Sequence, residues 1–172
     1  MAEKESTRAD GIDVVSIVTP NHLHVPIAKI FAENGIHIIC DKPIGMSSKE
    51  AIDLKKVIES KKLIFALTHN YTGYPMVRHA RSLVQKGDLG SLRVIQAEYP
   101  QDWLTTKAED SGLKQAEWRT DPKRSGAGGC IGDIGTHAYN LIRFITGLEV
   151  DEISADIHTF VEGRKVDDNA QI

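Results

Sequence analysis

The chain has 172 residues, of which 41% are hydrophobic and 26% are charged, and its formal net charge at pH 7 is -3. This length allows one ordinary domain, or one domain and part of another, and the composition is that of a globular chain rather than a disordered one. The slightly negative charge argues against nucleic acid or an anionic membrane surface as a partner, and no stretch reaches the roughly 20 apolar residues of a membrane span.

The N-terminal stretch and the cysteines indicate the compartment. The stretch MAEKESTRADG is charged and lacks the apolar core of a secretory signal. The two cysteines, Cys40 and Cys130, lie in apolar or glycine-rich segments and show no spaced disulfide framework. We therefore expect a reducing, cytoplasmic setting.

Apolar runs and helical patterns alternate in the first part of the chain. The runs that predict buried strands are residues 12–19, 36–40 and 63–67. Between them, one helix is predicted over about 24–34, with Pro26 near its start and Gly35 past its end, and a second begins at the capping box Ser47-Ser48-Lys49-Glu50. Such alternation specifies right-handed crossovers and a parallel sheet.

The pattern changes near Gly90. A helix is predicted over 75–86, closed by Gly87, and residues 92–99 then alternate apolar and polar side chains like a half-exposed antiparallel strand. The predicted fold class is therefore α/β followed by α+β, with one domain over residues 1–70 and another over residues 71–172.

A long segment without periodicity follows. Residues 100–132 contain Trp103, Trp118 and Arg119, and a loop of this length in a compact domain is usually functional. A helix is predicted over 133–146 and a strand over 152–161.

Polar residues follow the predicted strands where each strand ends. Ligands of open α/β sheets bind outside the carboxyl ends of the strands, so these groups are candidates for one site. They are Thr19, Pro20, Asn21 and His24 after the first strand, Asp41, Lys42 and Pro43 after the second, and Asn70, Tyr71, Tyr74 and Pro75 after the third. The ammonium of Lys42 can donate a hydrogen bond to a substrate oxygen or orient a cofactor. A solvated surface lysine is the alternative interpretation.

Asp133 and His137 lie four residues apart at the start of a predicted helix, so their side chains share one face. A carboxylate near a helix N-terminus stays ionised and favours protonation of a neighbouring imidazole, which then suits general acid or base catalysis. A solvated ion pair or an N-cap interaction is the alternative.

Two other motifs carry less weight. Residues 126–133 (GAGGCIGD) come close to a dinucleotide-binding fingerprint, but the preceding TDPKRS is not a strand, so we reject that reading and expect the glycines to let the backbone pass close to a ligand. His22 and His24 lack cysteine or acidic partners nearby, and we predict no metal site.

The chain resembles the glucose-fructose oxidoreductase, inositol dehydrogenase and rhizopine catabolism family (Gfo/Idh/MocA) in four segments that occur in the right order. These are IDVVSIVTPNHLH, Asp41-Lys42-Pro43, GDLGSLRVIQAEY and WRTDPKRSGAGGCIGDIGTHAYNL. The resemblance implies the C-terminal part of a Rossmann-like, NAD(P)-binding parallel sheet over 1–70. Over 71–172 it implies the start of a substrate-binding and oligomerisation domain with an open, largely antiparallel sheet.

The same resemblance implies an NAD(P)-dependent oxidoreductase that acts on a sugar, a polyol or a related hydroxyl or carbonyl compound. It implies a catalytic set of Lys42, Asp133 and His137, in which His137 donates or accepts the proton while a nicotinamide carries the hydride. The residues that it places at the cofactor are Thr19, Pro20, Asn21, His24, Asp41, Lys42, Pro43, Asn70, Trp118 and Arg119. It also implies a homo-oligomer, a dimer or tetramer, formed through the sheet of the second domain. Asp41 replaces the commoner glutamate of the motif and is shorter by one methylene.

The family's glycine-rich turn, its residue that selects NAD or NADP, and its later sheet strands do not appear in this sequence. We therefore expect the chain to be the middle of a longer enzyme, to bind NAD(P) poorly or not at all by itself and to be inactive alone. A catalytically silent, ligand-binding member of the family is the rival hypothesis, and a metal-dependent lyase or hydrolase is the third. The presence of Lys42, Asp133 and His137 together favours the enzyme.

Overall fold

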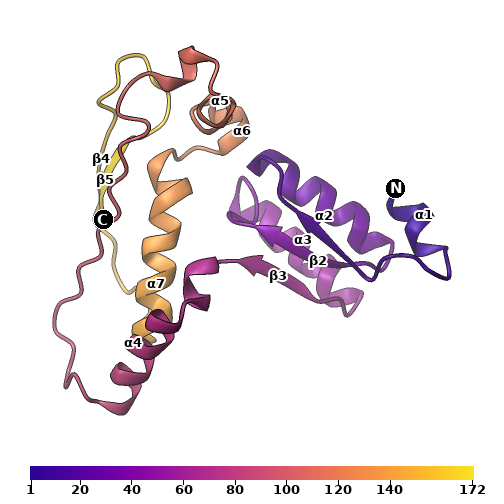
Figure 1. The fold of residues 1–172 in the computed structure, drawn as a ribbon, viewed down its shortest axis with the longest axis horizontal. Coiled ribbons are helices and arrows are strands. Elements are labelled where there is room, and N and C mark those ends of the chain that lie inside the picture. The colour runs from indigo at the N-terminus through magenta and orange to yellow at the C-terminus, as the bar shows by residue number, and fades with distance from the viewer. The chain divides into compact units, whose positions relative to one another are not determined.

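The computed structural model describes residues 1–172 and divides them into two compact units (Figure 1). The first unit contains residues 1–68 and 121–127, and the second contains residues 69–120 and 128–172. The short segment 121–127 therefore belongs by its contacts to the first unit, although the sequence on both sides of it belongs to the second.

The first unit is built on a parallel sheet of three strands, β1 (Val14–Ile17), β2 (His37–Asp41) and β3 (Phe65–Thr68), in that order. Ile17 pairs with Cys40, and Asp41 pairs with Thr68. The carboxyl ends of the three strands consequently lie on one edge of the sheet. The predicted parallel sheet is confirmed, although each strand is shorter than, or shifted from, its apolar run.

Two helices cross over between these strands, α2 (His24–Glu33) and α3 (Ser48–Ser60). Their apolar faces share one core with the sheet, which includes Ala28, Ile38 and Leu54. Ser47 caps α3 as the capping box predicts, because its side chain accepts a hydrogen bond from the Glu50 N–H at 3.3 Å. A short helix that the sequence analysis did not predict, α1 (Ala2–Ser6), precedes the sheet, and η1 (Asn21–Leu23) joins β1 to α2.

The second unit begins with η2 (Asn70–Gly73) and α4 (Pro75–Lys86). Proline at the first position of α4 and Gly87 after its end, at φ 77°, give this helix the predicted boundaries. Its later elements are η3 (Ala108–Ser111), α5 (Lys114–Arg119), the π-helical turn η4 (Ile131–Gly135), α7 (Thr136–Thr146), β4 (Asp156–His158) and β5 (Asn169–Gln171). Strands β4 and β5 pair antiparallel. Helix α6 (Pro122–Ser125) belongs to the first unit.

Helices α4 and α7 pack side by side in the second unit (Figure 1). The guanidinium carbon of Arg81 on α4 lies 4.5 Å from the ring centroid of Phe144 on α7. This contact spans more than 60 positions of sequence and fixes α7, the helix that carries His137, against the segment that follows β3.

Three predicted elements of the second unit were wrong in type or extent. Residues 92–99 form no strand, and the strand predicted over 152–161 is limited to β4. An alternating pattern shows which side chains suit a buried face, but a strand also needs a partner for its backbone hydrogen bonds. The helix predicted from Asp133 begins as an α-helix only at Thr136, because Asp133 lies in the π-helical turn before it.

The longest helix, α3, has 13 residues, and none of the helices has both the length and the apolar character needed to cross a bilayer.

Candidate active site

The loop after β1 contains a buried hydroxyl group that lacks a hydrogen-bond partner. This atom is Oγ1 of Thr19. An unsatisfied buried polar atom costs about 1 to 3 kcal/mol, so a partner supplied by a ligand would be favourable here. Thr19 follows the carboxyl end of a parallel strand, which is where open α/β sheets bind their ligands.

His24 ties the loop after β1 to the loop after β2. Its ring is 1% exposed, with Nδ1 at 2.7 Å from the carbonyl oxygen of Pro43 and Nε2 at 2.7 Å from that of Thr19. A carbonyl only accepts, so a neutral ring donates to one of the two and an imidazolium donates to both. Both ring nitrogens face the protein backbone, and His24 sets the spacing of the two loops.

The predicted motif at the end of β2 is also built into the sheet edge. Asp41 is the last residue of β2, and its Oδ1 accepts a hydrogen bond of 2.6 Å from the hydroxyl of Thr68 at the end of β3. Lys42 and Pro43 follow, joined by a cis peptide bond, and both side chains are partly exposed. The lysine is therefore placed at the carboxyl edge, as predicted from its position after the strand.

Asn21 anchors the segment 121–127 to this edge. The residue is 7% exposed, and its Nδ2 donates a 2.8 Å hydrogen bond to the carbonyl oxygen of Ser125. Asp121 caps α6 by accepting from the Lys123 N–H at 3.0 Å. The side-chain amide of Asn21 is thus used to hold the stretch of chain that leads into the glycine-rich turn.

In the second unit, Arg119 pairs with Asp133. The Nε of Arg119 donates to Oδ2 of Asp133 at 3.0 Å, and each side chain is about one quarter exposed. The guanidinium carbon lies 4.2 Å from the ring centroid of Trp118 and 5.7 Å from that of Trp103. Arg119 also donates to the side chain and the carbonyl oxygen of Gln115 on its own helix. The ion pair and the aromatic rings together fix the orientation of the Asp133 carboxylate.

His137 lies in the first turn of α7 and is surrounded by aromatic rings. It is 7% exposed, and its ring centroid lies 4.6 Å from that of Tyr71, 6.0 Å from that of His69 and 6.4 Å from that of Tyr99. The hydroxyls of Tyr71 and Tyr99 share a 2.5 Å hydrogen bond. That bond, with burial and neighbouring charges that include Asp133, raises the pKa of Tyr71 to about 12, so this phenol is protonated at neutral pH. The environment of His137 is thus compact and aromatic.

The contacts of His69 and Tyr99 with the ring of His137 were not predicted from the sequence. His69 directly follows β3, just as the other candidate residues follow the ends of their strands. That position in the sequence could have marked it as a candidate site residue. Tyr99 ends the segment that was interpreted as a strand, and nothing local indicates that its ring meets His137.

The glycine-rich turn before Asp133 is held by the chain itself. A Cβ atom on Gly129 would lie 2.2 Å from the carbonyl oxygen of Asp167, far closer than atoms approach without a bond. The expectation that these glycines make room for a ligand is wrong at this position, where they make room for the segment before β5.

The second unit also has an open depression of about 510 Å³, lined by Tyr99, Pro100, Gln101, Asp102, Trp103 and Thr105. An aromatic face beside amide, carboxylate and hydroxyl groups suits a polyhydroxylated ligand.

The predicted site residues are thus gathered in two groups. Those of the first unit are Thr19, Pro20, Asn21, His24, Asp41, Lys42 and Pro43, along one sheet edge. Those of the second unit are Asn70, Trp118, Arg119, Asp133 and His137, among which Asn70 is exposed at the start of η2. That Lys42 acts together with Asp133 and His137 stays a prediction.

Two family models match the chain. The one described as "Oxidoreductase family, NAD-binding Rossmann fold" matches residues 2–69, and the one described as "GFO/IDH/MocA C-terminal domain" matches residues 77–172. The chain therefore belongs to the Gfo/Idh/MocA family of oxidoreductases. Its parallel sheet is part of a Rossmann domain, and its antiparallel pair belongs to the start of the second domain.

Curated relatives include an oxidoreductase of Bacillus subtilis and a sugar dehydrogenase. The chain is 33% identical to the uncharacterized oxidoreductase YfiI of B. subtilis, over 100% of the chain and 44% of that protein. It is also 33% identical to levoglucosan dehydrogenase of Pseudarthrobacter phenanthrenivorans, over 89% of the chain and 37% of that protein. The chain thus spans less than half the length of these relatives.

Solved structures show the same arrangement of elements. The oxidoreductase from Sinorhizobium meliloti is 47% identical with a TM-score of 0.81, over 99% of this chain and 42% of that one. An inositol dehydrogenase homolog from Azotobacter vinelandii, complexed with NAD+, is 29% identical with a TM-score of 0.94, over 98% of this chain and 44% of that one. Levoglucosan dehydrogenase in complex with NADH and levoglucosan is 31% identical with a TM-score of 0.83, over 97% of this chain and 45% of that one.

Proposed function

We propose that this chain supplies active-site residues of an NAD(P)-dependent oxidoreductase that acts on a sugar, a polyol or a related hydroxyl or carbonyl compound. The observation that carries the proposal is the ion pair of Arg119 with Asp133. Asp133 precedes the buried His137 by four residues. A carboxylate and an imidazole held in this way suit proton transfer at a substrate hydroxyl. A relative named levoglucosan dehydrogenase and a solved structure named as an inositol dehydrogenase homolog support the substrate class.

The sheet edge of the first unit fits a nicotinamide cofactor. The buried, unpartnered hydroxyl of Thr19 is the observation that favours a polar ligand there. The residues proposed to hold the cofactor are Thr19, Pro20, Asn21, His24, Asp41, Lys42, Pro43, Asn70, Trp118 and Arg119. Among these, Asn21 and His24 act by fixing the two loops, since their polar atoms bind backbone carbonyls. A bound nicotinamide accepts the hydride in the oxidative direction and supplies it in the reductive one.

In the oxidative direction, a ring nitrogen of His137 accepts the proton from the oxygen of the substrate hydroxyl, while the carbon that bears this oxygen loses its hydrogen as a hydride and the C=O double bond forms. The ammonium of Lys42 donates a hydrogen bond to that oxygen and stabilises the negative charge that develops on it. The carboxylate of Asp133, held by Arg119, accepts a hydrogen bond from a neighbouring substrate hydroxyl and so orients the substrate. In the reductive direction, His137 returns the proton to the carbonyl oxygen.

Spectrophotometry on the full-length protein tests the proposal. The protein is mixed with NAD+ or NADP+ and a panel of sugars and polyols, and the absorbance of the reduced nicotinamide is followed. His137→Asn is expected to lower kcat by about 100-fold to 10,000-fold, because proton transfer contributes that much, and to change cofactor affinity by less than about threefold. His79→Asn, on the exposed side of α4, is the matched control and is expected to retain wild-type kinetics.

Two results would change the assignment. Equal losses of kcat and cofactor affinity in His137→Asn would mean that the histidine is structural. Binding of nicotinamide and sugar without turnover by the wild-type protein would identify a ligand-binding member of the family, which is the rival hypothesis.

A further inference from the structure

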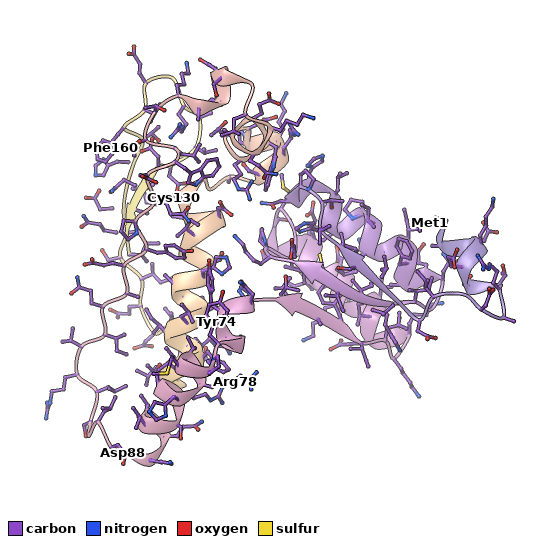
Figure 2. The ribbon with its side chains drawn as sticks, viewed as in Figure 1. Met1, Tyr74, Arg78, Asp88, Cys130 and Phe160 are labelled. Atoms are coloured by element: carbon purple, nitrogen blue, oxygen red, sulfur yellow. The ribbon has the colours of Figure 1, made fainter.

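Asp167 binds three consecutive residues of the glycine-rich turn. Its Oδ1 accepts a 2.6 Å hydrogen bond from the Gly129 N–H. Its Oδ2 accepts one of 2.8 Å from the Ile131 N–H and one of 2.9 Å from the thiol of Cys130. The carbonyl oxygen of Asp167 accepts a further bond of 2.9 Å from the Cys130 N–H. One residue therefore receives four donors from residues 129–131. Figure 2 labels Cys130, the middle residue of this stretch.

The fit around this contact is tight and electrostatically favourable. A Cβ on Gly129 would meet the Asp167 carbonyl oxygen at 2.2 Å and a methyl group of Val166 at 2.7 Å, so only glycine allows the approach. Burial alone would raise the pKa of Asp167, but the hydrogen bonds from Cys130, Ile131 and Gly129 outweigh it, and the pKa lies below its ordinary value. Asp167 is thus an ionised acceptor at neutral pH.

The turn that Asp167 holds leads directly into the candidate site. The Asp133 N–H donates to the carbonyl oxygen of Gly129 at 3.0 Å, so the backbone of Asp133 is bonded to a residue that Asp167 fixes. Asp133 itself lies in the π-helical turn η4, a rare local structure that occurs frequently at functional sites. Asp167 bonds to Ile131, the first residue of this turn, and therefore anchors the start of η4 from another part of the chain.

We propose that Asp167 is a positioning residue, which fixes the glycine-rich turn 129–132 and thereby sets the place from which Asp133 meets Arg119. This inference rests on the function proposed above for Asp133 and His137. Asp167 acts through the turn, since its side chain bonds to residues 129–131.

The neighbouring aspartate provides a matched control. Asp168 accepts hydrogen bonds from the N–H groups of Phe160 and Val161 at 2.7 and 3.0 Å, and one from Arg164 at 3.3 Å. It has the same charge and adjoins Asp167 in sequence, but it holds the turn between β4 and β5 rather than the glycine-rich turn. If substitution acted only by loosening the local fold, the variants at Asp167 and Asp168 would lower kcat to a similar extent.

The test compares Asp167→Asn with Asp168→Asn in the full-length protein. Asparagine has one oxygen, so either the Gly129 or the Ile131 N–H would face an NH2 group and lose its acceptor. Asp167→Asn is expected to lower kcat by about 10-fold to 100-fold, with cofactor affinity changed by less than about threefold, because small misplacements of catalytic groups have effects of this size. Asp168→Asn is expected to lower the melting temperature and to change kcat by less than about threefold.

A double variant separates positioning from folding. If Asp167 acts by placing Asp133, then adding Asp167→Asn to Asp133→Asn should cost less than about threefold in kcat, because the carboxylate that Asp167 positions is already lost. An equal loss in both backgrounds would show that Asp167 only stabilises the fold and would overturn the proposal.

Amide hydrogen exchange tests the contact of Asp167 with the glycine-rich turn without relying on catalytic activity. Asp167→Asn should speed exchange across residues 129–133 by at least about tenfold, while Asp168→Asn leaves these amides at the wild-type rate. Unchanged exchange in Asp167→Asn would overturn the anchoring contact itself. Absence of nicotinamide turnover in the wild-type protein would instead overturn the proposed function, so the two failures are distinct.

Discussion

Arg119 illustrates how one residue joins several parts of the candidate site. Its guanidinium donates to Asp133 and to Gln115 and also covers the ring of Trp118. A planar guanidinium with five donors in a rigid fork can make these contacts at once, whereas the ammonium of a lysine is a compact point charge that cannot stack its plane on a ring. The position therefore requires arginine and not only a positive charge.

Arg119→Lys in the full-length protein is expected to lower kcat by about 10-fold, because the Asp133 carboxylate loses the partner that orients it. Steady-state kinetics at saturating cofactor measure the effect. Arg78→Lys on the exposed face of α4, which is labelled in Figure 2, is the control and should match the wild type. A kcat for Arg119→Lys within twofold of the wild type would contradict the role of the ion pair.

At the scale of elements, the joint between the glycine-rich turn and α7 decides the geometry of the site. The chain passes Asp167 at Gly129, forms the π-helical turn η4 and then becomes α-helical at Thr136. The glycines of this joint are not equivalent. Gly129 is pressed against backbone, whereas a Cβ on Gly132 would have nothing within 4 Å.

Gly129→Ala is expected to destabilise the protein by about 1 to 3 kcal/mol or more, because the new methyl group overlaps a carbonyl oxygen and the backbone must shift. Gly132→Ala makes the same chemical change in open space and should alter stability by less than about 1 kcal/mol. Urea unfolding of both variants measures the difference. Equal stabilities would mean that residues 129 and 167 do not approach as closely as the structure shows.

At the scale of the whole molecule, the two units rely on different interactions. The apolar core cluster lies in the first unit, around residues such as Ile38 and Leu54. The second unit contains a buried ionic cluster instead. The Arg164 side chain is 1% exposed and donates to both carboxylate oxygens of Glu109, to Asp168 and to the carbonyl oxygens of Leu104 and Thr106. Carboxylates in such clusters make stability depend on pH.

Acid should therefore weaken the second unit. The hydrogen bond from Arg164 lowers the pKa of Glu109 below its ordinary value of 4.5, against the opposing effect of burial. A carboxyl group whose pKa is lower in the folded state stabilises the fold above the unfolded-state pKa, and that contribution is lost as the pH falls through the folded-state pKa. The pKa of Asp167 is lowered as well, so its contribution has the same sign.

Glu109→Gln is expected to cost about 1 to 3 kcal/mol at pH 7, because the buried Arg164 loses one of its two charged partners. It should also flatten the decline of stability between about pH 5 and about pH 3, since the titrating group is removed. Urea unfolding at several pH values measures both effects. A decline as steep as that of the wild type would mean that Glu109 does not contribute to acid sensitivity, and Glu162→Gln at an exposed position serves as the control.

The sequence by itself determined the local elements and the identity of the chemical groups. The three strands, their helices and the parallel order could be predicted because apolar runs, capping residues and helix-ending glycines act on neighbouring residues. The positions of Lys42 after β2 and of His137 in the first turn of a helix could be predicted for the same reason. The alternating pattern of 92–99 was misleading, because strand formation depends on a partner that the pattern does not identify.

Only the tertiary structure decided which of these groups touch. Arg119 pairs with Asp133 across 14 positions, Tyr71 and Tyr99 enclose His137, and Asp167 holds residues 129–131 from nearly 40 positions away. It also decided that 121–127 packs with the first unit and that Asp133 lies in a π-helical turn. Local periodicity carries no information about such contacts, because they form only when packing brings distant segments to the same place and satisfies their buried polar groups together.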